Sequence, residues 1–334
     1  METNRITAAL NEFARCTVWH PDFEKAKRLI MKSIATTAER NDPSSTLLTG
    51  ESGVGKTRLC LIINRDLGMP HMSDTEAHLK CVRPCVYLEV PPNATLKSVA
   101  CEILTELVKT AEELADPESE VSDRYNFREY ESMSLAKVEI MIIQRLRTLE
   151  TTLLILDEFH HVADRGKDAT KLTICNWLTN LLNKSKIAIL LSGSTKITTI
   201  VNSVAELSGR YPYRATVREL DYCNEFDAPI FLSVLAGLEK EMIRIGELVD
   251  YIHLTDLKLY KAMRLATKGN FRALSDLLND SFKIALTRGD NTLKIGDFIE
   301  AYEDLHLSEA GENPFEMSLE MLESIPLSVV KKNE

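Results

Sequence analysis

Short apolar runs alternate with longer segments of helical periodicity through the first two thirds of the chain. Each short run is apolar at every position, which predicts strands at 46–48, 86–90, 153–156 and 187–191. A period near 3.6 residues predicts helices at 23–40, 58–65, 96–114, 135–149 and about 170–183. Strands that are apolar on both faces and alternate with helices indicate an α/β fold, in which helices cover both sides of a parallel sheet.

The pattern changes after about residue 218, where the strand signals vanish and residues 226–285 are predicted to form helices. Residues 1–18 resemble a short helical extension, polar residues 69–80 predict a loop, and 115–132 is a polar stretch. The predicted organisation is an extension at 1–18, an α/β core at 19–218, a small helical domain at 219–300 and an acidic tail at 301–334.

Composition places the chain among globular proteins, because 44% of its 334 residues are hydrophobic and 27% are charged. The net charge is −10, but residues 300–334 hold nine acidic residues against two lysines. The rest of the chain is therefore close to neutral, which leaves room for a local DNA-facing surface. An apolar run of 18 residues and a secretory signal are both absent, and seven scattered cysteines suit reduced thiols, so we expect a cytoplasmic protein without membrane contact.

Residues 50–57 carry the strongest chemical signal. Their sequence, GESGVGKT, fits the phosphate-binding pattern G-x-x-x-x-G-K-[ST] and lies between a predicted strand and a predicted helix. The glycines let backbone N–H groups face the phosphates of ATP, Lys56 would reach the β- and γ-phosphates, and Thr57 would ligate Mg²⁺. We expect the nucleotide to contact Glu51, Ser52, Gly53, Val54, Gly55, Lys56, Thr57 and Arg58.

Acidic residues follow the apolar strand at 153–156. The carboxyl end of a parallel strand lies at the sheet edge that also carries the phosphate loop, so Asp157 and Glu158 are expected beside the nucleotide. Asp157 is predicted to hold the Mg²⁺ shell and Glu158 to polarise the attacking water. Ser194, at the end of the next strand, is predicted to hydrogen-bond the water or the γ-phosphate.

Two arginines complete the predicted site. Arg210 is expected on a loop after the last strand, from which it would reach the nucleotide of a neighbouring subunit; Arg214 is its nearby competitor. Arg272 is expected to open a helix of the second domain and to fold over the phosphates. For both positions, an ordinary surface or ion-paired arginine is the alternative interpretation.

Taken together, these residues resemble the AAA+ ATPases, and more narrowly the TnsC/TniB branch of ATP-dependent transposition regulators. The resemblance covers about residues 19–285. Besides the ATPase motifs it rests on His20-Pro21, on residues 87–97 (YLEVPPNATLK), on residues 157–161 (DEFHH) and on residues 206–210. The family has Gly-Thr where this chain has Gly193-Ser194, and segments 69–82 and 115–132 match poorly.

The resemblance implies an ATP-dependent homo-oligomer, a ring or a filament, that wraps duplex DNA regardless of sequence. Such a protein is recruited by a targeting complex, through a TniQ-type protein in CRISPR-associated transposons or through a dedicated DNA-binding protein, and passes the DNA to transposase subunits. It also implies that Arg210 acts in trans. Lys97 and the predicted helix cap Ser134 are the candidate DNA contacts. A helicase loader or replication initiator, and a signalling ATPase without DNA, are the alternatives.

Three further features allow more than one interpretation. The pattern His71, His78, Cys81, Cys85 suggests zinc but fits no common ligand spacing. His160 and His161 suggest a metal ligand or a base, although polar residues beside the nucleotide are the simpler interpretation. The tail after Glu300 is either a solvated end or an attachment point for a transposase subunit.

Overall fold

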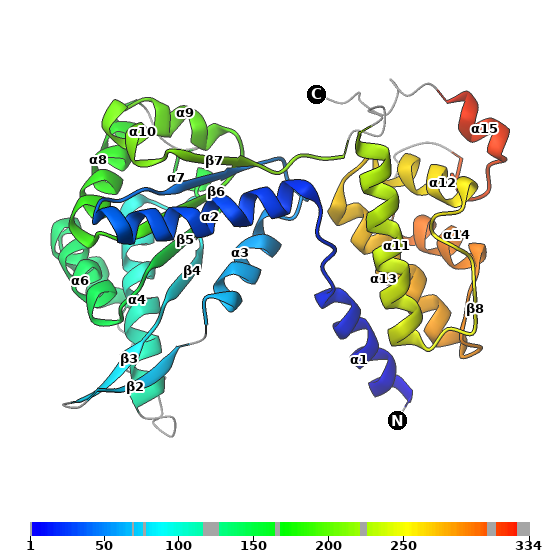
Figure 1. Ribbon diagram of the computed structural model, residues 1–334, viewed down its shortest axis with the longest axis horizontal. Helices are drawn as coiled ribbons and strands as arrows, with labels where there is room; N and C mark the ends of the chain where they lie inside the picture. The colour runs from blue at the N-terminus through cyan, green and yellow to red at the C-terminus, as the bar shows by residue number, and fades with distance from the viewer. Residues whose placement is uncertain are drawn as a thin grey trace. The chain divides into compact units, whose positions relative to one another are not determined.

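Strands and helices alternate in the first two thirds of the computed structural model, and helices dominate the last third (Figure 1). The structure describes residues 2–68, 70–75, 78–115, 127–163, 168–220, 226–305 and 312–325. The chain divides into two units, an α/β unit of Asp22–Val217 and a helical unit that combines Met1–Pro21 with Arg218–Glu334.

A five-stranded parallel sheet forms the centre of the α/β unit, with the strand order β4-β5-β6-β1-β7. This arrangement confirms the predicted fold class. The strands are β1 (Thr46–Thr49), β4 (Cys85–Glu89), β5 (Leu153–Asp157), β6 (Ala188–Gly193) and β7 (Tyr213–Thr216). Because all five run the same way, their carboxyl ends meet at one edge, where a ligand site is expected.

Alternate residues of each central strand enter two different hydrophobic cores. In β5, Leu154 and Leu156 pack into one core, whereas Leu153 and Ile155 pack into the other, and all four are fully buried. Each buried leucine or isoleucine contributes about 1.5–3 kcal/mol relative to an exposed one. The helices whose buried residues enter the first core include α4 (Leu96–Ala115), α6 (Leu135–Thr148) and α8 (Asp168–Ser185), and those that enter the second are α2 (Pro21–Arg40) and α3 (Lys56–Asp66).

Two strand pairings differ from the sequence prediction. The predicted loop at 69–80 is instead an antiparallel hairpin of β2 (His71–Thr75) and β3 (His78–Val82), whose polar sequence lacks the apolar alternation that reveals a strand. Strand β7 was not predicted either, because it is a short edge strand in which only Ala215 is buried. Short helices connect the elements: α5 (Phe127–Ser132), α7 (His160–Ala163), α9 (Lys196–Asn202) and α10 (Ala205–Arg210).

The helical unit has its own core. Its helices are α1 (Glu2–Arg15), α11 (Asp227–Gly246), α12 (Leu257–Thr267), α13 (Phe271–Arg288), α14 (Ile295–Asp304) and α15 (Leu319–Ser324), and its two-residue strands are β8 (Asp250–Tyr251) and β9 (Thr292–Leu293). Phe13 of α1 packs edge-on against Phe282 at 5.3 Å between ring centroids. The predicted N-terminal extension therefore belongs to this core.

The segment predicted as an acidic tail also joins the helical unit in part. Helix α14 continues to Asp304, so the predicted boundary at 300 falls inside a helix. Phe315 is 1% exposed and stacks on Phe298 with 5.7 Å between ring centroids. Lys261 of α12 contacts Glu323 of α15 at 2.6 Å. Residues 312–325 thus pack as part of the core, and the remaining predicted tail lies outside the described residues.

Candidate functional site

The loop after β1 approaches its neighbours so closely that two of its glycines have no substitute. A Cβ on Gly50 would lie 2.1 Å from the carbonyl oxygen of Val217. Gly55 has φ +93°, and a Cβ there would lie 2.7 Å from Cζ of Phe23 on α2. L-residues rarely adopt this backbone conformation, so glycine is required by the backbone as well as by the space. The turn is therefore fixed between β1 and the start of α3.

Lys56 begins α3 and is 5% exposed. Its ammonium group donates to the carbonyl oxygens of Gly50 at 2.9 Å and Glu51 at 2.7 Å, so it lies inside the curve of the loop. A buried ammonium group at the N-terminus of a helix makes the loop an anion site, because the free N–H groups of the first turn add positive potential. The other predicted contacts occupy the same turn and the first turn of α3: Ser52, Gly53, Val54, Thr57 and Arg58.

Thr57 and the acidic end of β5 are in direct contact. The Thr57 hydroxyl donates to Oδ2 of Asp157 at 2.6 Å, and the backbone N–H of Glu158 donates to Oδ1 at 3.0 Å. Asp157 is fully buried. A hydroxyl and a carboxylate are the oxygen ligands that Mg²⁺ prefers, so the chemistry of this pair fits the predicted metal.

Tyr87 of β4 also contacts this pair and was not among the predicted site residues. Its hydroxyl donates to Oδ2 of Asp157 at 3.4 Å. Burial raises the pKa of the Tyr87 hydroxyl, and the Asp157 carboxylate adds to the effect, so the group stays a donor. The strand register pairs Glu89 with Asp157, which places Tyr87 two residues earlier on the same face of the adjacent strand. The position of Tyr87 in this register is the signal that could have identified it, but using it requires knowing that β4 and β5 are neighbours.

Glu158 follows Asp157 in the left-handed conformation, with φ 52°. Its Oε2 lies 3.1 Å from Nδ1 of His160, and the two side chains are 26% and 17% exposed. The Glu158 carboxylate therefore follows the predicted magnesium ligand Asp157 in the chain but faces His160. His161 turns the other way, with Nδ1 2.9 Å from the carbonyl oxygen of Val90 at the end of β4.

Ser194 lies at the same edge of the sheet. The carbonyl oxygen of Gly193, the preceding residue, accepts from the N–H of Gly50 at 3.2 Å, which ties the end of β6 to the phosphate loop. The Ser194 hydroxyl is buried and has no hydrogen-bond partner within the described part of the chain. Buried polar groups are normally paired, so this hydroxyl suits a role in contacting a ligand.

Arg210 occupies the opposite edge of the sheet. Arg210 is the last residue of helix α10, not part of a loop, and strand β7 follows it, so it does not come after the last strand. Both parts of that prediction are wrong. The Arg210 carbonyl oxygen accepts from Ser45 N–H at 2.7 Å, directly before β1 begins, and its guanidinium contacts Asp42. The phosphate loop instead follows the carboxyl end of β1. Arg214, the competitor, is exposed and donates to the Ser208 hydroxyl at 3.0 Å.

Arg272 lies in the helical unit as the second residue of α13. The helix begins there as predicted, because the Asn270 side chain caps it by accepting from the Arg272 N–H at 3.0 Å. The side chain of Arg272 is exposed. Its predicted contact with the phosphates stays a prediction, since it and the phosphate loop belong to different units.

The two candidate DNA contacts lie close to each other. Thr95 caps α4, with its hydroxyl accepting from Ser98 N–H at 3.1 Å, and the Lys97 ammonium group in the first turn donates to the carbonyl oxygen of Glu131. Ser134 is exposed and caps α6 by accepting from Lys137 N–H at 3.3 Å, which confirms the predicted cap. Both candidates therefore lie at helix N-termini, where exposed N–H groups favour an anion.

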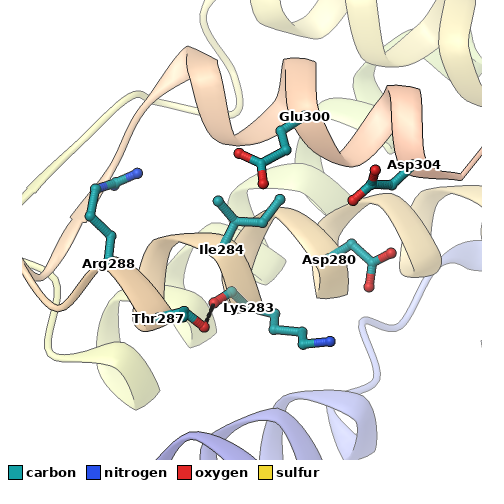
Figure 2. A pocket seen from close by; sticks show the side chains of 7 residues that line it. All are labelled: Asp280, Lys283, Ile284, Thr287, Arg288, Glu300 and Asp304. Atoms are coloured by element: carbon teal, nitrogen blue, oxygen red, sulfur yellow. Dashed lines mark hydrogen bonds between the residues drawn. The ribbon is translucent and has the colours of Figure 1, made fainter.

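Two features remain, the predicted zinc pattern at residues 71–85 and a cavity of the helical unit. Cys85 is buried in β4, and His71 is exposed on the hairpin opposite Val82. A cavity of about 450 Å³ lies between α13 and α14. Figure 2 shows Lys283 and Glu300 among the side chains that line it. None of the predicted nucleotide contacts lines it. The six cysteines with described side chains are free, and no described helix has the length and apolar character needed to cross a bilayer.

Among the solved structures with a similar fold are the following three. The ORC1 protein of Aeropyrum pernix, solved in complex with DNA, is 18% identical over 87% of this chain and 67% of its own, with a TM-score of 0.57. Cdc6p of Pyrobaculum aerophilum is 14% identical over 93% and 72%, with a TM-score of 0.54. A Walker-type ATPase of Pyrococcus abyssi is 15% identical over 84% and 71%, with a TM-score of 0.53.

The sheet order, the glycine-rich phosphate loop and the acidic strand end define the AAA+ ATPase fold, with a helical unit after the sheet. Within that class, the chain belongs to the bacterial TniB protein family, whose model matches residues 15–218. No curated protein matches the sequence.

Proposed function

We propose that this protein binds and hydrolyses ATP between neighbouring copies of itself on duplex DNA, and so regulates transposition. The observation that carries the proposal is the division of the catalytic set between two edges of one sheet. Lys56 and Asp157 lie at the carboxyl edge, whereas Arg210 lies at the amino edge of β1. A head-to-tail contact brings the amino edge of one copy to the carboxyl edge of the next, and repeating that contact gives a ring or a filament.

Each side chain has a defined task in this proposal. The Lys56 ammonium group exchanges the carbonyl oxygens of Gly50 and Glu51 for the β- and γ-phosphates. Thr57 and Asp157 are the residues that would hold Mg²⁺, which neutralises charge on the phosphates when bound.

The groups around the γ-phosphate complete the reaction. Glu158 orients the attacking water, and the buried hydroxyl of Ser194 contacts that water or the γ-phosphate. Tyr87 keeps Asp157 in place by donating to Oδ2. A guanidinium from the neighbouring copy, supplied by Arg210, stabilises the charge of the transferring phosphoryl group. Arg272 is proposed to sense the nucleotide from the helical unit.

Membership in the TniB family is what points to transposition, and it implies transposase subunits and a TniQ-type targeting protein as partners in the cytoplasm. The exposed Ser134 cap and the first turn of α4 around Lys97 support phosphate binding, since helix N-termini bind phosphate without reading sequence. The second candidate is a replication initiator or helicase loader, which the fold shared with ORC1 and Cdc6p favours. Stimulation of strand transfer by a cognate transposase separates the two.

Binding to a random-sequence duplex in the presence of a non-hydrolysable ATP analogue tests the DNA half of the proposal. We expect Ser134→Asp to weaken binding by more than about tenfold, because aspartate caps a helix as well as serine but repels phosphate. Ser134→Asn keeps the cap without the charge and is the matched control. Equal binding by both variants, with unchanged salt dependence, would remove Ser134 from the interface.

Lys97 is tested in the same assay. Lys97→Ala should lower affinity and reduce the slope of log affinity against log salt by about one unit, since one phosphate contact is lost. Lys25→Ala, which removes an exposed lysine from α2, is the control for net charge. Lys56→Ala should abolish nucleotide-dependent DNA binding altogether, and DNA binding that persists without nucleotide would contradict the proposed coupling.

A further inference from the structure

Glu158, His160 and His161 form a cluster of metal-ligating side chains beside the predicted magnesium ligands. One ligand atom from each of the three lies within 4.8 Å of the others. All three side chains are half-buried, and the two imidazole rings are 4.4 Å apart between centroids. Two imidazoles and a carboxylate are a common ligand set for zinc and similar divalent ions.

The backbone holds these three groups in place. Glu158 is in the left-handed conformation, and α7 starts two residues later at His160, so the chain turns sharply and brings the three side chains together. Gly193 at the end of β6 leaves the space that the His160 ring occupies, because a Cβ there would lie 2.8 Å from Nδ1. The ends of two strands therefore fix the cluster, which lowers the entropy lost when an ion binds.

His161 has the arrangement of a metal-ligating histidine. Its Nδ1 lies 2.9 Å from the carbonyl oxygen of Val90, and since a carbonyl only accepts, Nδ1 carries the proton. With Nδ1 donating to Val90, Nε2 is the ring nitrogen that can bind an ion. Histidine ligands usually donate their other ring nitrogen in this way, which fixes the tautomer and the orientation of the ring.

We propose that Glu158, His160 and His161 bind a borderline divalent transition ion of the Zn²⁺ class, and that the bound ion stops ATP hydrolysis by withdrawing Glu158 from the attacking water. Nitrogen ligands favour such ions over Mg²⁺, which prefers the oxygen ligands of Thr57 and Asp157. The two ions therefore occupy adjacent sites of different chemistry. The inhibitory part rests on the proposed ATPase function, whereas the binding part does not.

Zinc binding is measured first on the purified full chain, by competition with a chromophoric chelator. Zn²⁺ is the only transition-metal ion added, and the buffer contains excess Mg²⁺. We expect one tightly bound ion per chain. His161→Asn retains a donor for Val90 but lacks Nε2. His160→Asn replaces the imidazole with an amide at about the position of Nδ1. Each substitution should weaken zinc binding by more than about tenfold. His253→Asn is the matched control, because His253 also contacts a glutamate, Glu239, at 3.0 Å. Unchanged zinc affinity in His160→Asn or His161→Asn, or an equal loss of affinity in His253→Asn, would overturn the site.

The effect of the ion on ATP turnover is measured second. At saturating ATP, Zn²⁺ should lower kcat at least about tenfold. In a separate binding assay, Zn²⁺ should leave the affinity for a fluorescent ATP analogue unchanged, since Lys56 and Thr57 are untouched. The His161→Asn variant should resist this inhibition, and additional Mg²⁺ should not relieve it. Inhibition that Mg²⁺ reverses, or zinc bound at the site without inhibition, would refute the regulatory claim. If the protein hydrolyses no ATP, the proposed function fails and the binding result stands by itself.

Discussion

Replacing Gly55 with alanine tests how firmly the phosphate loop is fixed to helix α2. The residue has φ +93°, and the added Cβ would lie 2.7 Å from Cζ of Phe23, which is itself buried. A left-handed L-residue costs about 1–2 kcal/mol and overpacking about 1–3 kcal/mol, so we expect a loss of about 2–5 kcal/mol in the free energy of unfolding. The α/β unit should still fold, because domains are stable by about 5–15 kcal/mol.

Urea unfolding followed by circular dichroism measures this loss, and a double-mutant cycle separates its two parts. In a Phe23→Leu background the side chain lacks Cζ, so Gly55→Ala should cost about 1–3 kcal/mol less than in the wild type. Gly209→Ala is the control, since a Cβ there meets no atom within 4 Å and alanine favours helix α10. Additive effects of the Gly55 and Phe23 substitutions would refute the reasoning, as would an unchanged midpoint for Gly55→Ala.

Three further predictions concern other parts of the chain. Arg83 is 7% exposed and contacts the Glu106 carboxylate at 2.7 Å, so Arg83→Met should lower the free energy of unfolding by about 1–3 kcal/mol in urea titrations; no change would show that the pair is not stabilising. Burial raises the pKa of the Cys85 thiol to about 12, so at about pH 8 a thiol reagent should label it only after unfolding, and fast native labelling would contradict its burial. The Lys294 ammonium group lowers the pKa of Asp290, so the ionised carboxylate stabilises the fold above about pH 4 and this stabilisation is lost as the pH falls. Asp290→Asn should therefore flatten the decline of the melting temperature in acid. An unchanged decline would exclude Asp290 as its origin.

The sequence was sufficient where chemistry and spacing coincide locally. The eight-residue phosphate pattern and the apolar run that ends in Asp157 each lie within one loop or one strand end, and parallel strands bring such ends to a common edge. This explains why the contact between Thr57 and Asp157, which are a hundred residues apart, follows from two local patterns. The Ser134 cap was predicted for the same reason, since a cap is recognised within one turn.

Features that depend on the order of strands or on distant partners could not be predicted. Tyr87 joins the site only because β4 lies next to β5, and the position of Arg210 at the amino edge depends on Ser45 and on the unpredicted strand β7. Helix α1 resembled a free extension because its partner, Phe282, lies far along the chain. Such contacts arise from tertiary packing, which local propensity does not encode.

Mixing two inactive variants tests the central claim, that one copy supplies Arg210 to the nucleotide held by another. Arg210→Ala keeps an intact phosphate site, and Glu158→Gln keeps the arginine, so each alone should hydrolyse ATP at least about a thousandfold more slowly than the wild type on DNA. In an equal mixture, about one quarter of random head-to-tail contacts join an intact site to an intact arginine, and we predict about one quarter of wild-type activity. A mixture that stays as inactive as its components would contradict a shared site.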